Sequence, residues 1–73
     1  MNNTETLNET IALRLKALIE KKQVKLCIVA KETGISQNTV NRFLKCKQMP
    51  RLRHILLLVG YFKCTVNYLL GLD

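Results

Sequence analysis

Four polar side chains in the middle of the sequence carry groups that can hydrogen-bond to the edges of base pairs. An amide presents a donor beside an acceptor and can bond adenine in bidentate fashion, and a guanidinium can do the same with guanine. These side chains belong to Gln37, Asn38, Asn41 and Arg42. A single exposed Asn or Gln is usually only solvated, but four such groups at helical spacing favour contact with bases in a major groove.

A helix must present these groups, and residues 25–44 predict two short helices joined by a glycine turn. In the first half of this stretch the apolar residues fall at helical spacing. Gly34 then supplies the residue best able to adopt a left-handed turn conformation. Ser36 is a natural N-cap for a helix that begins at Gln37, so Gln37 and Asn38 stand at the leading end of that helix. This is the end of a recognition helix that enters a major groove.

The rest of the sequence predicts further helices and no strand, so the expected fold class is all-α. Thr6 and Glu9 have capping-box spacing ahead of an apolar stripe, and Thr65 stands at the capping position of the last helix. We expect residues 1–6 to form a flexible tail and residues 7–73 to form a single domain. The five expected helices span about 7 to 22, 25 to 33, 37 to 45, 52 to 62 and 66 to 70.

Five segments, taken in order, resemble the lambda-repressor-like helix-turn-helix family of Cro and the phage repressors. They are IALRLKALIEKKQV, AKETGIS, VNRF, the P-x-L-x-x-I-L-x-L run from Pro50, and TVNYLLGL. Each segment alone is weak evidence, whereas their order and spacing over about residues 11–72 make the resemblance specific. The resemblance implies a compact five-helix domain that binds double-stranded DNA. It also implies a transcriptional repressor whose helix at 37–45 enters the major groove of a palindromic operator.

The resemblance assigns roles to residues in and around the helix at 37–45. The residues expected to contact bases are Gln37, Asn38, Asn41 and Arg42, and those expected to contact the DNA backbone are Lys25, Ser36, Thr39, Lys45, Lys47 and Arg51. Thr39 and Asn41 match positions nearer the backbone side of the groove. Val40 and Phe43 lie on the opposite face and match the buried pair of the family, so we assign them to the core.

The formal net charge of +7 is concentrated in the second half of the chain. Residues 33–72 contain no acidic side chain. A one-sided basic half suits phosphate contact and predicts binding that weakens strongly as salt is added. A basic surface without a partner is the plainer interpretation, but the polar set on the helix at 37–45 favours DNA. The basic residues of this half are Arg42, Lys45, Lys47, Arg51, Arg53 and Lys63.

The chain departs from the family at several positions. Many relatives have an arginine paired with a glutamate where this chain has Ile19 and Leu44, and two apolar residues can replace a buried ion pair without loss of stability. We therefore expect Ile19 and Leu44 to be in contact. Lys25 stands where relatives often have a hydroxyl cap, which weakens this helix start. Cys46 and Lys63 replace glycines that often end helices in the family, and a left-handed backbone there costs each about 1 kcal/mol.

Two apolar residues, Leu57 and Tyr61, lie one helical turn apart where relatives usually have polar side chains. With Leu72 they predict an exposed apolar patch, unless the helix at 52–62 is simply buried more fully. The functional interpretation is a homodimer about a twofold axis, which would place two recognition helices about one DNA turn apart. A function of another class also stays open: an antitoxin or other protein-interaction module of the same fold that binds a protein partner.

Catalysis, metal binding and membrane insertion are not expected of this chain. With one histidine, three cysteines that form no CxxC pair and five scattered acidic residues, it offers no catalytic or zinc-binding constellation, so no cofactor is expected. No stretch is apolar enough for a membrane helix and the start lacks the features of a signal peptide, so we expect a cytoplasmic protein. Cys27 and Cys64 are expected in the core, and Cys46 and His54 at the surface.

Overall fold

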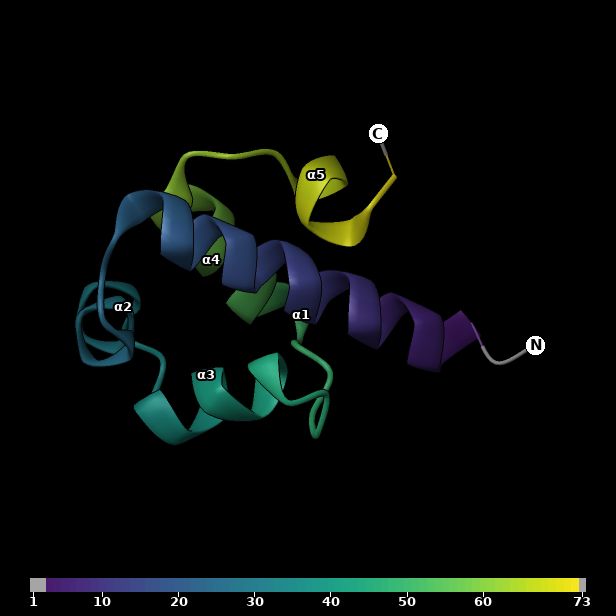
Figure 1. Cartoon of the computed structure of the whole chain (residues 1–73), viewed down its shortest axis with the longest axis horizontal. Helices are drawn as coiled ribbons and strands as arrows, with labels where there is room; N and C mark the ends of the chain where they lie inside the picture. Colours follow the sequence, from purple (N-terminus) through teal and green to yellow (C-terminus); the bar gives the residue numbers. More distant parts are fainter. Residues whose placement is uncertain (1–2, 73) are drawn as a thin grey trace.

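The computed structural model describes residues 3–72, which form five α-helices around one core (Figure 1). The helices are α1 (Asn3–Lys22), α2 (Leu26–Thr33), α3 (Gln37–Leu44), α4 (Leu52–Phe62) and α5 (Val66–Leu70). The long α1 packs against α3 and α5, which lie on opposite sides of it in Figure 1. α2 packs against α3 and α4, and α4 packs against α5. The predicted all-α fold is confirmed, and no helix within residues 3–72 is both long and apolar enough to cross a membrane.

A single hydrophobic core holds the five helices together. Every helix contributes at least one buried apolar side chain, and the turn between α2 and α3 contributes another. Burying one side chain of this size stabilises the fold by roughly 1.5–3 kcal/mol relative to leaving it exposed. Val40 and Phe43 from α3 belong to this core, as predicted. The core consists of Ile11, Leu15, Val29, Ile35, Val40, Phe43, Ile55, Leu58 and Leu69.

The first helix begins earlier than the sequence predicted. α1 starts at Asn3, so residues 3–6 belong to a helix and not to a tail, and residues 1 and 2 lie outside the described residues. Thr6 lies inside the helix, where its carbonyl oxygen accepts a hydrogen bond of 3.0 Å from the Thr10 hydroxyl. The capping role predicted for Thr6 is therefore wrong. The segment contains no glycine or proline that would end the helix earlier, and capping-box spacing also occurs within a continuous helix.

The turn between α2 and α3 is held by a short set of local hydrogen bonds. Gly34 adopts the predicted left-handed conformation, with φ of 77°, and its N–H donates to the Ala30 carbonyl at 2.9 Å. The buried Thr33 hydroxyl donates to the Val29 carbonyl at 2.7 Å and accepts from the Ile35 N–H at 3.2 Å. Because these bonds satisfy polar groups on both sides of the turn, they fix the angle at which α3 leaves α2.

Within residues 3–72, three residues with side chains adopt the left-handed conformation that glycine usually takes. Cys46 and Lys63 do so with φ of 58° and 54°, so the backbone expected from the family is kept at both positions. Gln23, the residue after α1, also does so with φ of 57°, which the sequence did not predict. In each case a β-carbon lies close to the following carbonyl oxygen, at a cost of about 1 kcal/mol.

His54 is buried in the first turn of α4, so the prediction of a surface histidine is wrong. Its Nδ1 accepts the backbone N–H of Arg51 at 3.3 Å, and its ring lies 5.3 Å from the ring of Phe43. Arg51 at the N-cap has only donor groups in its side chain and cannot cap the helix itself. The imidazole therefore supplies an acceptor that this helix start otherwise lacks. Burial lowers the pKa of His54, and the nearby positive charges of Arg53 and Arg51 lower it further.

The cysteines divide differently from the prediction. Cys46 is exposed as expected, but Cys27 is also exposed and Cys64 is only half-buried. The buried side of α2 follows Val29 and Thr33, and Cys27 lies off that stripe, which explains its exposure. Burial raises the pKa of the Cys64 thiol. Among the described residues, no three side chains of His, Cys, Asp or Glu come together in a possible metal site.

Ile19 and Leu44 lie on two helices that pack against each other. Both side chains are half-buried and pack against the core, Ile19 from α1 and Leu44 from α3. This is the environment in which an apolar pair can stand in for an ion pair. Direct contact between the two side chains stays a prediction.

Candidate nucleic-acid interface

One side of α3 is buried and the other is exposed and polar. Val40 and Phe43 are 1 % exposed or less, whereas Gln37, Asn38 and Arg42 are exposed. Successive residues of an α-helix are about 100° apart, so positions 37, 38, 41 and 42 fall within an arc of roughly 140° away from the buried pair. Asn41 belongs to this arc but is half-buried. The structure therefore brings the four predicted base-contacting residues onto one face.

The leading end of α3 is capped by the residue that the sequence predicted. The Ser36 Oγ accepts the backbone N–H of Thr39 at 3.1 Å, and the two hydroxyl oxygens of Ser36 and Thr39 lie 2.7 Å apart. Only one hydroxyl proton is needed for the bond between them. The other remains available to an external acceptor, such as a phosphate oxygen. The pair thus combines a structural role with one free donor beside the exposed face of α3.

Positively charged side chains stand before and after α3 along the chain. Lys45 is the residue after α3, Lys47 lies in the following loop, and Arg51 precedes α4. Lys25 precedes α2, with no side-chain hydrogen bond to cap that helix, as expected for a lysine. All four side chains are exposed. In Figure 1, α3 lies along one edge of the molecule between α2 and the loop that leads to α4.

Arg53 is a candidate that the site prediction omitted. It is exposed in the first turn of α4, and its guanidinium nitrogen lies 3.5 Å from the Nε2 of His54. The first turn of a helix also favours anions, because its free N–H groups carry partial positive charge. The position of Arg53 two residues after Arg51, in the basic half of the chain, was the sequence signal that could have indicated a backbone contact. The buried histidine beside it was not recognisable from the sequence.

The predicted dimer residues are exposed to different extents. Leu57 is 39 % and Leu72 is 68 % exposed, whereas Tyr61 is half-buried, with the Lys22 ammonium 4.6 Å from its ring centroid. Two leucines that the prediction omitted, Leu52 and Leu56, are 70 % and 53 % exposed. Leu56 lies one helical turn after Leu52, and Leu57 is next to it on the same exposed side of α4. We call these three residues the α4 apolar face.

Comparison with known protein families gives a match over most of the chain. The family described as the Cro/C1-type HTH DNA-binding domain matches residues 14–73. The match covers residues 14–22 of α1, all of α2 to α5, and hence the turn and the polar face described above. Comparisons with curated proteins and with solved structures give no match.

Proposed function

Because the chain belongs to the family of Cro/C1-type helix-turn-helix DNA-binding domains, we propose that it is a sequence-specific transcriptional regulator of the repressor type, acting in the cytoplasm. In this proposal α3 enters the major groove of a palindromic operator. The observation that carries it is the orientation of α3, whose apolar side is buried while its polar side faces solvent. A major groove about 12 Å wide admits an α-helix presented in this way.

We assign the reading of sequence to the exposed arc of α3. Gln37 and Asn38 stand at the capped end of the helix, where their amides can reach base edges first. Arg42 lies one turn further and suits guanine, while the half-buried Asn41 has a shorter reach. One good bidentate contact discriminates against a wrong base by about 1–3 kcal/mol. Gln37 is accordingly the residue whose loss should most alter sequence preference.

We assign affinity without sequence preference to the flanking cations and hydroxyls. Lys45, Lys47 and Arg51 would lie along one phosphate backbone, and Lys25 with the Ser36 and Thr39 hydroxyls would lie along the other. Each phosphate neutralised releases counterions, so the logarithm of the binding constant should fall by about 0.9 per phosphate for each tenfold rise in salt. These contacts would position α3 without specifying bases.

The test is selection of bound sequences from a random duplex library at about 150 mM salt, where non-specific attraction is weakened. We expect an inverted repeat, and Gln37→Ala should weaken it or blur one position in each half-site. Recovery of no motif, with binding that only fades as salt rises, would contradict the proposal. It would favour the protein-interaction module instead.

Two asparagines provide a matched control for this selection. Asn38 and Asn67 both occupy the second position of a helix whose N-cap is a hydroxyl residue, and both are exposed. Asn38→Ala and Asn67→Ala therefore remove the same amide from the same local setting. We expect only Asn38→Ala to lower the affinity for the selected operator, because α5 lies on the other side of α1 from α3. Equal losses from both variants would argue against a specific role for α3.

A further inference from the structure

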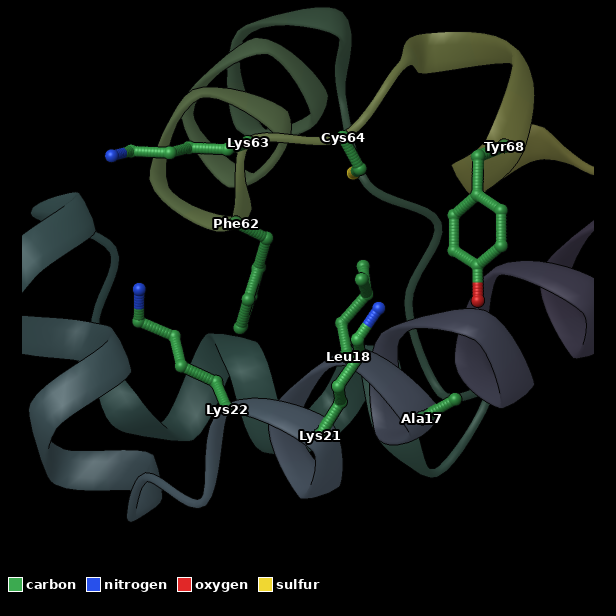
Figure 2. Close-up of a pocket in the computed structure, with 8 residues that line it drawn as sticks. All are labelled: Ala17, Leu18, Lys21, Lys22, Phe62, Lys63, Cys64 and Tyr68. Carbon is green, nitrogen blue, oxygen red and sulfur yellow. The ribbon is translucent and has the colours of Figure 1, made fainter.

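A groove opens on the part of the molecule that does not carry the helix-turn-helix. It lies between the C-terminal half of α1 and the junction of α4 with α5, and none of its lining residues belongs to α2 or α3 (Figure 2). Its volume is about 510 Å³. Pockets that hold small ligands measure about 300–1,000 Å³. The groove therefore has room for a small molecule that binds independently of DNA.

The walls of the groove are apolar and already held in place. Leu18 and Phe62 point toward each other from α1 and α4, and the ring of Tyr68 stands at one end (Figure 2). The Phe62 ring packs edge-on against Tyr61 at 4.8 Å between centroids. The Arg14 guanidinium lies 4.6 Å from the Tyr68 ring centroid and donates to the Tyr68 carbonyl at 3.1 Å. Walls that are ordered before binding reduce the entropy lost when a ligand enters.

The rim of the groove is positively charged. Lys21 and Lys22 come from the last turn of α1, Lys63 from the residue that ends α4, and all three are exposed. No acidic side chain is among the lining residues. The Lys22 ammonium stands 4.6 Å from the Tyr61 ring centroid, which keeps it near the mouth. Because all three lysines line one groove that has no acidic lining residue, an anion that enters it is favoured electrostatically.

We propose that this groove binds small organic acids in which an aromatic or acyl body carries a carboxylate. The body packs between Leu18, Phe62 and Tyr68, and the carboxylate lies among the ammonium groups of the rim. An uncharged molecule of the same shape would gain the apolar contacts only. A small inorganic anion would gain only the charge. The combination of the two features selects the amphiphilic acid.

The cysteines allow this proposal to be tested without DNA. Cys64 lines the groove, whereas Cys27 and Cys46 are exposed elsewhere and serve as internal references. The probe is naphthoate, and the readout is the rate at which iodoacetamide alkylates each cysteine, followed by mass spectrometry of peptides. At a naphthoate concentration of about ten times its dissociation constant, alkylation of Cys64 should slow by about tenfold. The rates at Cys27 and Cys46 should not change.

Matched variants separate the rim from general positive charge. The double variant Lys21→Gln, Lys63→Gln removes two rim charges, and Lys16→Gln, Lys31→Gln removes two exposed charges outside the groove. We expect only the first pair to weaken the protection of Cys64, by about tenfold in naphthoate concentration, as two partly screened ion pairs would. Naphthylmethanol, the uncharged analogue, should protect much less. Unchanged alkylation of Cys64, equal slowing of all three cysteines, or equal protection by the analogue would overturn the proposal.

Discussion

At the start of α4, a histidine takes the place that a glutamate or glutamine has in a capping box, three residues after the N-cap. The Nδ1 of His54 accepts the Arg51 N–H, which requires the neutral ring, and the ring also packs against Phe43 in the core. Protonation would remove the acceptor and put a positive charge beside Arg51 and Arg53. One buried residue thus links the core, the start of α4 and two of the cations beside the proposed DNA site.

Acid should destabilise the domain through His54. Burial, and then the charges of Arg53 and Arg51, lower the pKa of His54 below its ordinary value of 6.5. Between pH 6.5 and the lowered pKa, His54 binds a proton in the unfolded chain but not in the folded chain. The stabilisation that the neutral ring gives the folded state is therefore complete above pH 6.5 and is lost as pH falls through the lowered pKa. The free energy of unfolding in urea should therefore fall more steeply from about pH 7.5 to about pH 5 in the wild type than in His54→Gln. Parallel pH profiles would contradict this role.

At the scale of the elements, two helix ends differ from the family resemblance in residue type and not in conformation. Cys46 and Lys63 keep the left-handed backbone although each carries a β-carbon. The loops that follow α3 and α4 thus each contain a left-handed residue that carries strain. At Lys63 the side chain that causes this strain also contributes a charge to the groove rim.

Lys63→Gly should stabilise the domain by about 1 kcal/mol, because glycine adopts the left-handed conformation without the clash of a β-carbon. The measurement is the free energy of unfolding from urea titration. Lys63→Ala is the matched control, since it removes the same charge but keeps the β-carbon. If the alanine variant gained as much stability as the glycine variant, relief of charge repulsion would be the cause and backbone strain would not.

At the scale of the whole molecule, α4 carries apolar side chains on both of its sides. Ile55 and Leu58 fill the side that faces the core. Leu52, Leu56 and Leu57 stay in contact with solvent in the single chain. A small domain buries only a limited share of its surface, so covering the α4 apolar face by a second copy would add stability. The proposed dimer uses this face, together with Tyr61 and Leu72.

Leu57→Lys should convert a dimeric protein into a monomer, because it places a charge in the proposed interface. Sedimentation equilibrium gives the mass directly. Leu13→Lys is the matched control, since Leu13 is 69 % exposed on α1, outside the α4 apolar face. A monomer binds only one half-site at a time, so affinity for the full operator should also fall by about 100-fold or more. A Leu57→Lys protein with the mass of a dimer would show that this interface is wrong.

The features that depend on residues close together in the chain were determined by the sequence itself. Ser36, Thr65 and Gly34 act on backbone groups within about one turn of themselves. The bounds of α4 and α5 match the prediction, and those of α2 and α3 each differ from it by one residue. The buried side of α3 also follows from its periodicity. Family membership followed from the order of these local signals along the chain.

The features that depend on which surfaces meet were decided only by the tertiary structure. His54 is buried and Leu56 is exposed although both lie on the same short helix, because α4 turns one side toward the core. Periodicity indicates that a helix has two sides, but packing against α2 and α5 determines how much of each is covered. The groove has the same origin: residues 17–22 and 62–68 meet only because α1 packs against α5. No local pattern reports that meeting, since these residues are about forty positions apart.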